Sequence, residues 1–452
     1  MISSLSETIA AIATPPGVGA VALLRISGAE ALLVAEKIFR GKVAPSAMKS
    51  RYAYLGGIVD GEELIDEVLL TLFRAPRSYT GEDLVEISGH GGVFITNRLL
   101  ETILRAGARL ARPGEFTQRA YLHGKIDLAQ AEAVMDLITA QTRYAQHVAL
   151  EQHAGYLSEE MKKLRAELLT LVSQQEASFD FPEEELDLQE SDFLTAPLKS
   201  IITQVSGLIK KAQEGHLCRT GMLLALCGAP NTGKSSLLNK LLRSDRAIVS
   251  PLAGTTRDTI EEEVLLQGVP FRIIDTAGLR STEDPLEREG VLRAQAVLER
   301  ADLLLHLVDA TQRPEEITPL GQQEILLFNK IDLLEDRSAL KQSFPEALEI
   351  SCKTGEGIEN LIKNILERLL GPKTTLLEPA ATPLAMNTRQ LACLQRSLES
   401  LQRALLLQEE GSSGELVALE LHAALEAVGE VCGNVDSEEI LGEIFSNFCI
   451  GK

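Results

Sequence analysis

The segment GAPNTGKSS, residues 228–236, has the residue types and spacing of a phosphate-binding loop. Gly228 and Gly233 let the backbone curl so that its N–H groups point at phosphate oxygens, and the start of a following helix adds a favourable dipole. Lys234 is long enough to reach the β- and γ-phosphates, and the Ser235 hydroxyl is placed to coordinate Mg²⁺. An apolar, strand-like segment precedes the loop and a helical pattern follows it, as this motif requires. The loop residues expected to contact a nucleotide are Asn231, Thr232, Gly233, Lys234, Ser235 and Ser236.

Three further motifs, DTAG, NKID and SCK, follow in the order of a guanine nucleotide-binding domain. The carboxylate of Asp332 can accept hydrogen bonds from the ring and exocyclic N–H groups of guanine, whereas adenine lacks this pair of donors. Each motif is weak alone, but their common order is specific; a P-loop ATPase would require NKID to be accidental. The residues expected to contact the nucleotide here are Asp275, Thr276, Ala277, Gly278, Asn329, Lys330, Asp332, Ser351, Cys352 and Lys353.

The residue after DTAG is Leu279, where small GTPases commonly carry a water-orienting glutamine. An apolar side chain cannot polarise water, so another group must assist hydrolysis. Asn231 and the segment SPLAGTTRD offer oxygens that could surround a monovalent cation bridging the phosphates, and Thr256 is the expected switch ligand of Mg²⁺. The segment's expected nucleotide contacts are Ser250, Pro251, Leu252, Ala253, Gly254, Thr255 and Thr256.

Four regions with different patterns must position these residues. Residues 1–120 mix strand and helix patterns and predict an α+β domain; residues 121–217 and 373–452 are helical. In residues 218–372, short apolar strands alternate with helices, which predicts a parallel sheet covered on both faces. We expect one discontinuous helical domain with the α/β domain inserted in it, although two separate helical domains would give the same pattern.

Composition sets limits on the function. The chain has 452 residues, enough for about three domains, and a formal net charge of −21, which disfavours wholesale coating of nucleic acid. The six cysteines have neither CxxC spacing nor a nearby histidine in zinc-ligand order, so we expect free thiols in a reducing cytoplasm. We also expect no signal peptide and no membrane-spanning segment.

The chain ends in FSNFCIGK, with Cys449 three residues before the terminal lysine. From the residues alone, two interpretations stay open. Cys449 can be a small apolar residue that packs at the end of a helix, or a reactive thiol whose thiolate form is stabilised by Lys452.

Beyond the nucleotide motifs, several segments resemble one family, the bacterial tRNA modification GTPases MnmE, also called TrmE. The resemblance extends over essentially the whole chain. It rests on ATPPG, LLRISG, TGEDLVEISGHGG, RPGEFTQRAYLHGKIDLAQAEAV, IDTAGLR and the terminal FCIGK.

The resemblance implies a folate-binding-like N-terminal domain that dimerises and holds a tetrahydrofolate derivative. The implied folate-binding residues are Arg25, Glu86, Lys125 and Lys452. The implied cation is potassium, with Asn231, Ser250, Leu252 and Thr255 as its ligands; Ser250 replaces a common threonine but keeps the hydroxyl. Glu287 matches the family's proposed water-orienting acid, and Cys449 becomes a candidate for the modification chemistry.

The resemblance also implies a function. Family members act with a flavin-bearing partner, MnmG, and install an aminomethyl-type group on carbon 5 of the wobble uridine of certain tRNAs. GTP hydrolysis drives opening and closing of two G domains across the dimer. The competing hypothesis is a ribosome-assembly or signalling GTPase, a binding switch without modification chemistry.

Overall fold

The computed structural model describes residues 7–140, 142–180, 191–244, 261–275, 300–312, 323–370, 384, 386–433, 438–446, 448 and 450–451. The chain forms two compact units. The first comprises Met1–Met135, Gln152–Thr195 and Glu399–Lys452, and the second comprises Asp136–Glu151 and Ala196–Leu398. Because the chain leaves the first unit and returns to it, its helical part is discontinuous in sequence, as predicted. Each unit is described by itself.

The first unit contains a seven-stranded sheet of order β3-β4-β5-β6-β2-β1-β7, in which β1 and β7 are parallel and the other neighbours antiparallel. Buried Leu24 and Ile26 alternate along β2 with Arg25, which faces the opposite side of the sheet. Helices α1 and α2 supply buried residues to the same apolar cluster as Leu24 and Ile26. The elements are β1 (Ile9–Ile12), β2 (Val21–Ser27), α1 (Ala31–Ile38), β3 (Phe39–Gly41), η2 (Pro45–Ala47), β4 (Ala53–Asp60), β5 (Glu63–Phe73), β6 (Leu84–His90), α2 (Val93–Arg105) and β7 (Arg109–Leu110).

A buried ion cluster attaches helix α3 (Glu115–Leu122) to this sheet. The guanidinium of Arg119, only 1% exposed, lies 3.0 Å from Glu82 Oε2 and 3.1 Å from Glu115 Oε1. Arg109 Nη2 lies 2.7 Å from the same Glu115 oxygen. Burial alone would raise the pKa of the Glu115 carboxyl, but hydrogen bonds from Arg109, the Arg112 backbone and Arg119 outweigh it and lower this pKa to about 2. The carboxylate is therefore ionised at neutral pH and matched by buried positive charge.

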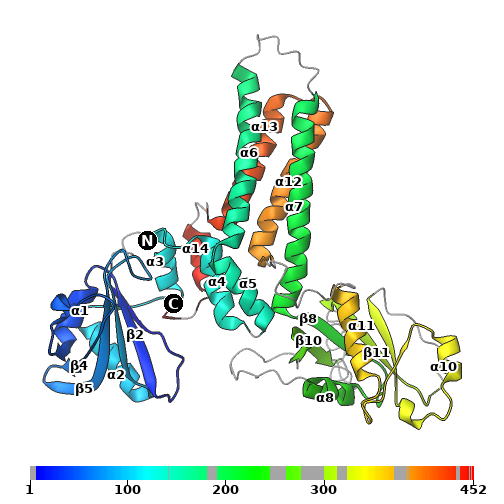
Figure 1. The fold of residues 1–452 in the computed structure, drawn as a ribbon, viewed down its shortest axis with the longest axis horizontal. Helices are drawn as coiled ribbons and strands as arrows, with labels where there is room; N and C mark the ends of the chain where they lie inside the picture. Colours follow the sequence, from blue (N-terminus) through cyan, green and yellow to red (C-terminus); the bar gives the residue numbers. More distant parts are fainter. Residues whose placement is uncertain are drawn as a thin grey trace, which may run out of the picture. The chain divides into compact units, whose positions relative to one another are not determined.

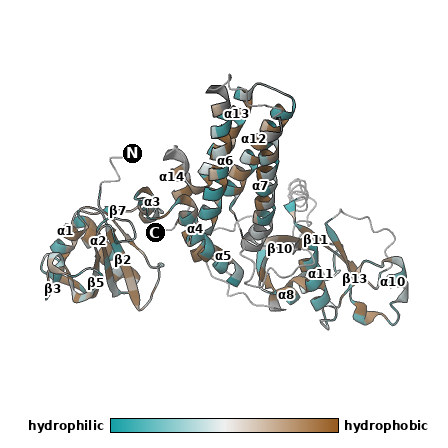
Figure 2. Cartoon of the chain, turned by 45° about the horizontal axis from the view of Figure 1, so that its top comes forward, coloured by the Kyte–Doolittle hydropathy of each residue, from teal (hydrophilic) through white to brown (hydrophobic). Residues whose placement is uncertain are grey.

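The helical stretches confirm the predicted pattern with one difference. Within the helical region predicted for residues 121–217, the chain ends one helix at Thr139 and begins another at Arg143. The Thr142 hydroxyl accepts a 2.9 Å hydrogen bond from the N–H of Ala145 and caps the second of these helices. Helices α6 and α13 lie side by side in the first unit (Figure 1), and both carry apolar and polar residues along their length (Figure 2). The helices are α4 (Leu128–Thr139), α5 (Arg143–His153), α6 (Tyr156–Asp180), α7 (Ser191–Thr220), α12 (Thr388–Glu409), α13 (Gly414–Cys432) and α14 (Glu438–Ser446).

The second unit contains a six-stranded sheet of order β13-β12-β11-β8-β10-β9, parallel except for β9. Helices α8 and α11 pack on one of its faces, through Leu237 and Leu241 of α8 and Leu361 and Ile365 of α11. Since the strands are parallel, β8, β10, β11 and β12 end at the same edge, where ligands bind in open α/β sheets. The elements are β8 (Met222–Cys227), α8 (Lys234–Ser244), β9 (Glu261–Leu266), β10 (Val269–Asp275), β11 (Leu303–Asp309), β12 (Glu324–Asn329), η4 (Ile331–Leu333), α10 (Ser338–Ser343), β13 (Leu348–Glu349) and α11 (Ile358–Leu370).

Among the residues that the structure describes, no helix is both long enough and apolar enough to cross a membrane.

The ion cluster predicts a large local effect of Arg119→Met. Removing one partner leaves the Glu115 carboxylate buried with less compensation, so the free energy of opening α3 should fall by about 3 kcal/mol. Hydrogen exchange of α3 amides in the full chain, read by mass spectrometry, measures this energy. Lys162→Met, which removes an exposed ion pair with Glu159, is the control and should leave exchange almost unchanged. Unchanged exchange of α3 in Arg119→Met would contradict the role given to this cluster.

Candidate functional site

The phosphate-binding loop lies at the predicted strand-to-helix junction, between β8 and α8. Gly228 and Gly233 have φ angles of +140° and +102°, and a Cβ at either position would collide with the Leu307 carbonyl or the Asn329 amide respectively. The ammonium of Lys234 curls back over the loop and donates 2.8 Å hydrogen bonds to the carbonyls of Gly228 and Ala229. The glycines are therefore required both for the turn and for close packing.

The side chain of Asn329 joins this loop to the SCK segment. Its Nδ2 donates a 2.8 Å hydrogen bond to the Thr232 carbonyl, and its Oδ1 accepts a 3.0 Å hydrogen bond from the N–H of Cys352. Asn329 is 2% exposed, so both bonds are shielded from water. The NKID motif thus fixes the positions of two other motifs as well as contributing its own side chains.

The carboxylate of Asp332 is oriented by the last motif. The Ser351 hydroxyl donates a 2.6 Å hydrogen bond to Asp332 Oδ1 and accepts a 3.1 Å bond from the N–H of Thr354. Burial raises the pKa of the Cys352 thiol to about 11, so at neutral pH this thiol is protonated and unsuited to nucleophilic chemistry. Lys353, the remaining SCK residue, is exposed. This arrangement suits Asp332 to accept hydrogen bonds from a nucleotide base. It suits Cys352 to line the nucleotide site without taking part in chemistry.

Asp275 is the last residue of β10 and pairs in register with Leu226 of β8, directly before the phosphate-binding loop. Ser235 lies in the first turn of α8, where its hydroxyl could hold a Mg²⁺ ion. The predicted residues that lie outside the described part are Ser250, Pro251, Leu252, Ala253, Gly254, Thr255, Thr256, Thr276, Ala277, Gly278, Glu287, Cys449 and Lys452.

The second predicted site lies on the sheet of the first unit, where Arg25 and Glu86 are cross-strand neighbours on β2 and β6. Arg25 Nε lies 2.8 Å from Glu86 Oε1, and the two side chains are 21% and 23% exposed. The Arg25 guanidinium also lies 6.0 Å from the centroid of the Tyr79 ring. A guanidinium–carboxyl pair beside an aromatic face is suited to a flat ligand with complementary donors and acceptors.

The C-terminal tail reaches this ion pair. Arg25 Nη1 donates a 3.4 Å hydrogen bond to the carbonyl of Gly451, and a Cβ on Gly451 would collide with the Ile12 carbonyl. Phe445 and Phe448 anchor the tail, with 2% and 7% exposure, in a cluster with Leu128 of α4. The described tail residues therefore connect the far end of the chain to β1 and β2.

Of the predicted folate-binding residues, Arg25 and Glu86 contact each other, whereas Lys125 has a different hydrogen-bond partner. Exposed Lys125 donates a 3.0 Å hydrogen bond to the Pro76 carbonyl, in the loop between β5 and β6. Sequence reasoning missed Tyr79 and the Gly451 carbonyl, although the resemblance included the terminal FCIGK and the segment TGEDLVEISGHGG, which begins directly after Tyr79. Their contacts with Arg25 of β2 span large distances in sequence. It also missed Asp309, which binds Lys330 (below), because a single carboxylate at a strand end gives no local signal.

Fold and site together define a multidomain P-loop GTPase whose α/β nucleotide-binding part is inserted in a helical scaffold. Residues 8–125 match the family described as GTP-binding protein TrmE N-terminus. Residues 128–449 match the family described as the MnmE helical domain. The chain belongs to the MnmE (TrmE) family of tRNA modification GTPases, and the predicted enzyme class is confirmed.

Curated relatives agree over the full length. The tRNA modification GTPase MnmE of Roseiflexus castenholzii is 42% identical over 468 residues, covering 99% of both chains. That of Symbiobacterium thermophilum is 44% identical over 460 residues, again covering 99% of both. Among solved structures, the G domain of the FeoB iron transporter of T. maritima is 27% identical with a TM-score of 0.25, covering 32% of this chain and 97% of that one.

The Asn329 bridge predicts a loss of nucleotide affinity in Asn329→Ala. The variant leaves the Thr232 carbonyl and the Cys352 N–H without this partner in a buried place, which costs about 2–4 kcal/mol, or roughly 30- to 1,000-fold in the Kd for GDP. Titration with a fluorescent GDP derivative measures the Kd. Asn364→Ala on α11, whose amide bonds to the Asn360 carbonyl, is the control and should bind normally. A Kd within twofold of the wild type in Asn329→Ala would contradict the bridge.

Proposed function

We propose that this chain is a potassium-dependent GTPase that acts with a flavin-containing partner, MnmG, in a heterotetramer-type complex. The complex installs an aminomethyl-type group, of the carboxymethylaminomethyl class, on carbon 5 of the wobble uridine of certain tRNAs. A tetrahydrofolate derivative supplies the one-carbon unit, and the protein works as a homodimer in the cytoplasm. The names of the relatives, tRNA modification GTPase MnmE, support the substrate class and the reaction.

The observation that carries this proposal is the contact between Arg25 and the Gly451 carbonyl. A GTP switch has no evident need for its C-terminal tail to lie on an ion pair of its N-terminal sheet. A modifying enzyme needs a carrier site and reactive groups close together, and Gly451 is two residues from Cys449 and adjacent to Lys452. We assign Arg25, Glu86, Lys125 and Lys452 to the folate derivative.

The structure describes only some of the residues that we propose as ligands of the metal ions. Ser235 and Thr256 would hold Mg²⁺, and Asn231 would hold K⁺ together with Ser250, Leu252 and Thr255. Asn231 has a φ of +63°, a left-handed conformation that asparagine tolerates better than most residues. A bound K⁺ supplies positive charge where negative charge develops during hydrolysis. Glu287 is the proposed water-orienting acid.

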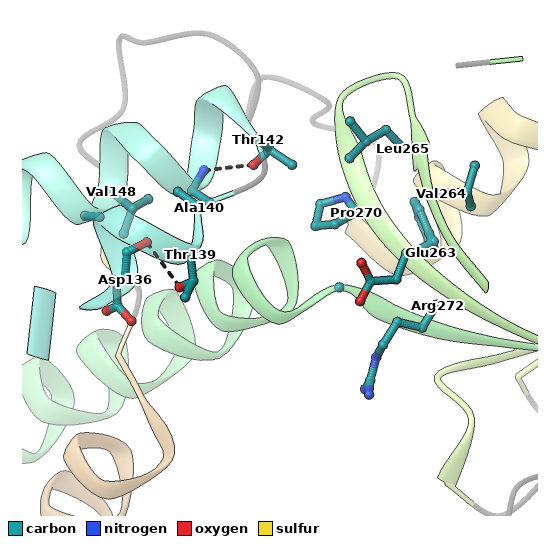
Figure 3. A pocket seen from close by; sticks show the side chains of 14 residues that line it. Asp136, Thr139, Ala140, Thr142, Val148, Glu263, Val264, Leu265, Pro270 and Arg272 are labelled. Atoms are coloured by element: carbon teal, nitrogen blue, oxygen red, sulfur yellow. Dashed lines mark hydrogen bonds between the residues drawn. The ribbon is translucent and has the colours of Figure 1, made fainter. Parts of the chain in front are cut away.

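A pocket in the second unit supports the coupling of hydrolysis to the helical scaffold. It has a volume of about 280 Å³ and lies between α4–α5 and the β9–β10 hairpin (Figure 3). Asp136 and Thr139 of α4 line one side, and cross-strand neighbours Glu263 and Arg272 line the other. The hairpin follows the segment of Thr256 and leads to Asp275, so it connects two nucleotide-binding segments and also borders the helices.

The domain boundaries are part of the same proposal. We assign residues 1–120 to folate binding and dimerisation, 121–217 and 373–452 to the two parts of the helical domain, and 218–372 to the G domain.

Potassium dependence gives a direct test. GTP turnover should be at least about tenfold faster in KCl than in NaCl at equal ionic strength, since only a cation of fitting size adds charge at the phosphates. Asn231→Gly removes the side chain while allowing the positive φ, so it should bind GDP but lose most of the stimulation. Phosphate release measures turnover. Equal rates of the wild type in both salts would refute the assignment of potassium.

Nucleoside analysis of tRNA tests the whole proposal. Cells lacking the protein should lose the modified wobble uridine, and the wild type should restore it. Arg25→Met should fail to restore it and should raise the Kd for a tetrahydrofolate derivative more than about tenfold, because a charge-assisted contact is lost. Arg98→Met, which removes an exposed pair with Glu63 in the same domain, is the control.

Two outcomes of this experiment would change the assignment. Normal uridine modification in cells with Cys449→Ser would reduce the thiol to a packing role. Normal modification in cells lacking the protein altogether would favour the ribosome-assembly or signalling switch.

A further inference from the structure

Asp309 forms an ion pair with the lysine of the NKID motif. Asp309 ends β11 and is the in-register neighbour of Asn329, the last residue of the adjacent strand β12. Lys330 Nζ lies 2.6 Å from Asp309 Oδ2, with the Asp309 side chain 5% exposed and the Lys330 side chain 34% exposed. The pair therefore lies at the edge of the sheet where the nucleotide motifs meet.

The Asp309 carboxylate is itself held in place. Its Oδ1 accepts hydrogen bonds from the N–H of Thr311 at 3.0 Å and from the Thr311 hydroxyl at 2.7 Å, which leaves Oδ2 directed at Lys330. Burial alone would raise the pKa of Asp309, but the bonds from Lys330 and Thr311 outweigh it and the pKa lies below its usual value. The carboxylate is consequently ionised and fixed at neutral pH.

Lys330 occupies an unusual backbone conformation, with a φ of +68°. Conformations of this kind persist in residues other than glycine only when the surroundings hold them. Its neighbours are constrained, since Asn329 bonds to the Thr232 carbonyl and Asp332 to the Ser351 hydroxyl. Asp309 constrains the remaining part, the charged end of the lysine side chain.

We propose that Asp309 is a positioning residue for the guanine nucleotide, because it holds the Lys330 ammonium so that the hydrocarbon stem of Lys330 stands ready as a wall for the purine ring. The inference rests on the proposed binding of GTP. A free lysine side chain has large rotamer freedom. When Asp309 orders this side chain before binding, less conformational entropy is lost as the ligand binds. The carboxylate also neutralises the nearby ammonium, so Lys330 serves the base rather than the terminal phosphate.

If Asp309 positions Lys330 for the base, loss of the Asp309 charge should weaken the binding of GDP and GTP equally. In Asp309→Asn, which keeps the shape and loses the charge, the Kd for both nucleotides should rise about 5- to 20-fold, with the ratio of the two constants unchanged. Titration of the full chain with fluorescent GDP and a non-hydrolysable GTP analogue measures both. A change confined to the GTP analogue would overturn the proposal, because it would place the effect at the γ-phosphate.

A double-mutant cycle distinguishes positioning from a general structural role. If Asp309 acts through Lys330, then Asp309→Asn should add no further loss in a Lys330→Met background. Additive losses would overturn the proposal. Thr311→Ala, which loosens the carboxylate but keeps its charge, gives a second test; it should raise the Kd about two- to threefold, and only while Lys330 is present.

Asp336→Asn is the matched control. Asp336 accepts hydrogen bonds from the N–H and hydroxyl of Ser338, the same local turn that Asp309 makes with Thr311, but Lys330 is paired with Asp309 instead. The Kd of the Asp336→Asn variant for GDP should stay within twofold of the wild-type value. If the wild type prefers ADP to GDP, the proposed function fails; if the wild type prefers GDP and Asp309→Asn binds it equally well, only this inference fails.

Discussion

The nucleotide site depends on the side-chain amide of Asn329. Parallel strands bring the NKID, SCK and phosphate-binding segments to one edge of the sheet, but the sheet alone does not set the distances between the loops that follow the strands. One buried amide does so, because its donor and acceptor bond to the Thr232 carbonyl and the Cys352 N–H at once. A carboxylate could not donate and a hydroxyl is too short, so the residue type follows from the geometry.

The first unit builds its candidate site in a different way, on the face of a sheet rather than at its edge. Antiparallel pairing places Arg25 opposite Glu86, and α1 and α2 pack with the apolar residues of the other face. The tail then supplies the Gly451 carbonyl. Gly451 is held there because Phe445 and Phe448 bury their rings against α4. The position of the tail therefore depends on hydrophobic packing several residues before it.

Local signals explain what the sequence predicted well. The glycines and lysine of the phosphate-binding loop, and the apolar strands before each motif, are readable because each feature is confined to a few neighbouring residues. The helical pattern predicted for residues 121–217 did not locate the break between α4 and α5, because that break depends on one capping hydroxyl, that of Thr142. The Arg119–Glu82 and Lys330–Asp309 pairs were missed because their partners are 37 and 21 residues apart, and charge alone does not specify which partner folding brings close. Arg25 and Glu86 were singled out only through the family resemblance, and their ion pair appears only in the structure.

The two halves of the nucleotide site differ in what a ligand must displace. At the base end, Asn329, Lys330 and Asp332 each have a protein partner that holds the side chain in place. At the phosphate end, Lys234 bonds to two loop carbonyls. A phosphate must draw the ammonium away from these neutral acceptors, and it succeeds because an ionised acceptor makes a stronger hydrogen bond than a carbonyl does. Until a phosphate binds, the same contacts keep the phosphate-binding loop curled. The loop therefore keeps its shape until Lys234 exchanges these carbonyls for a phosphate.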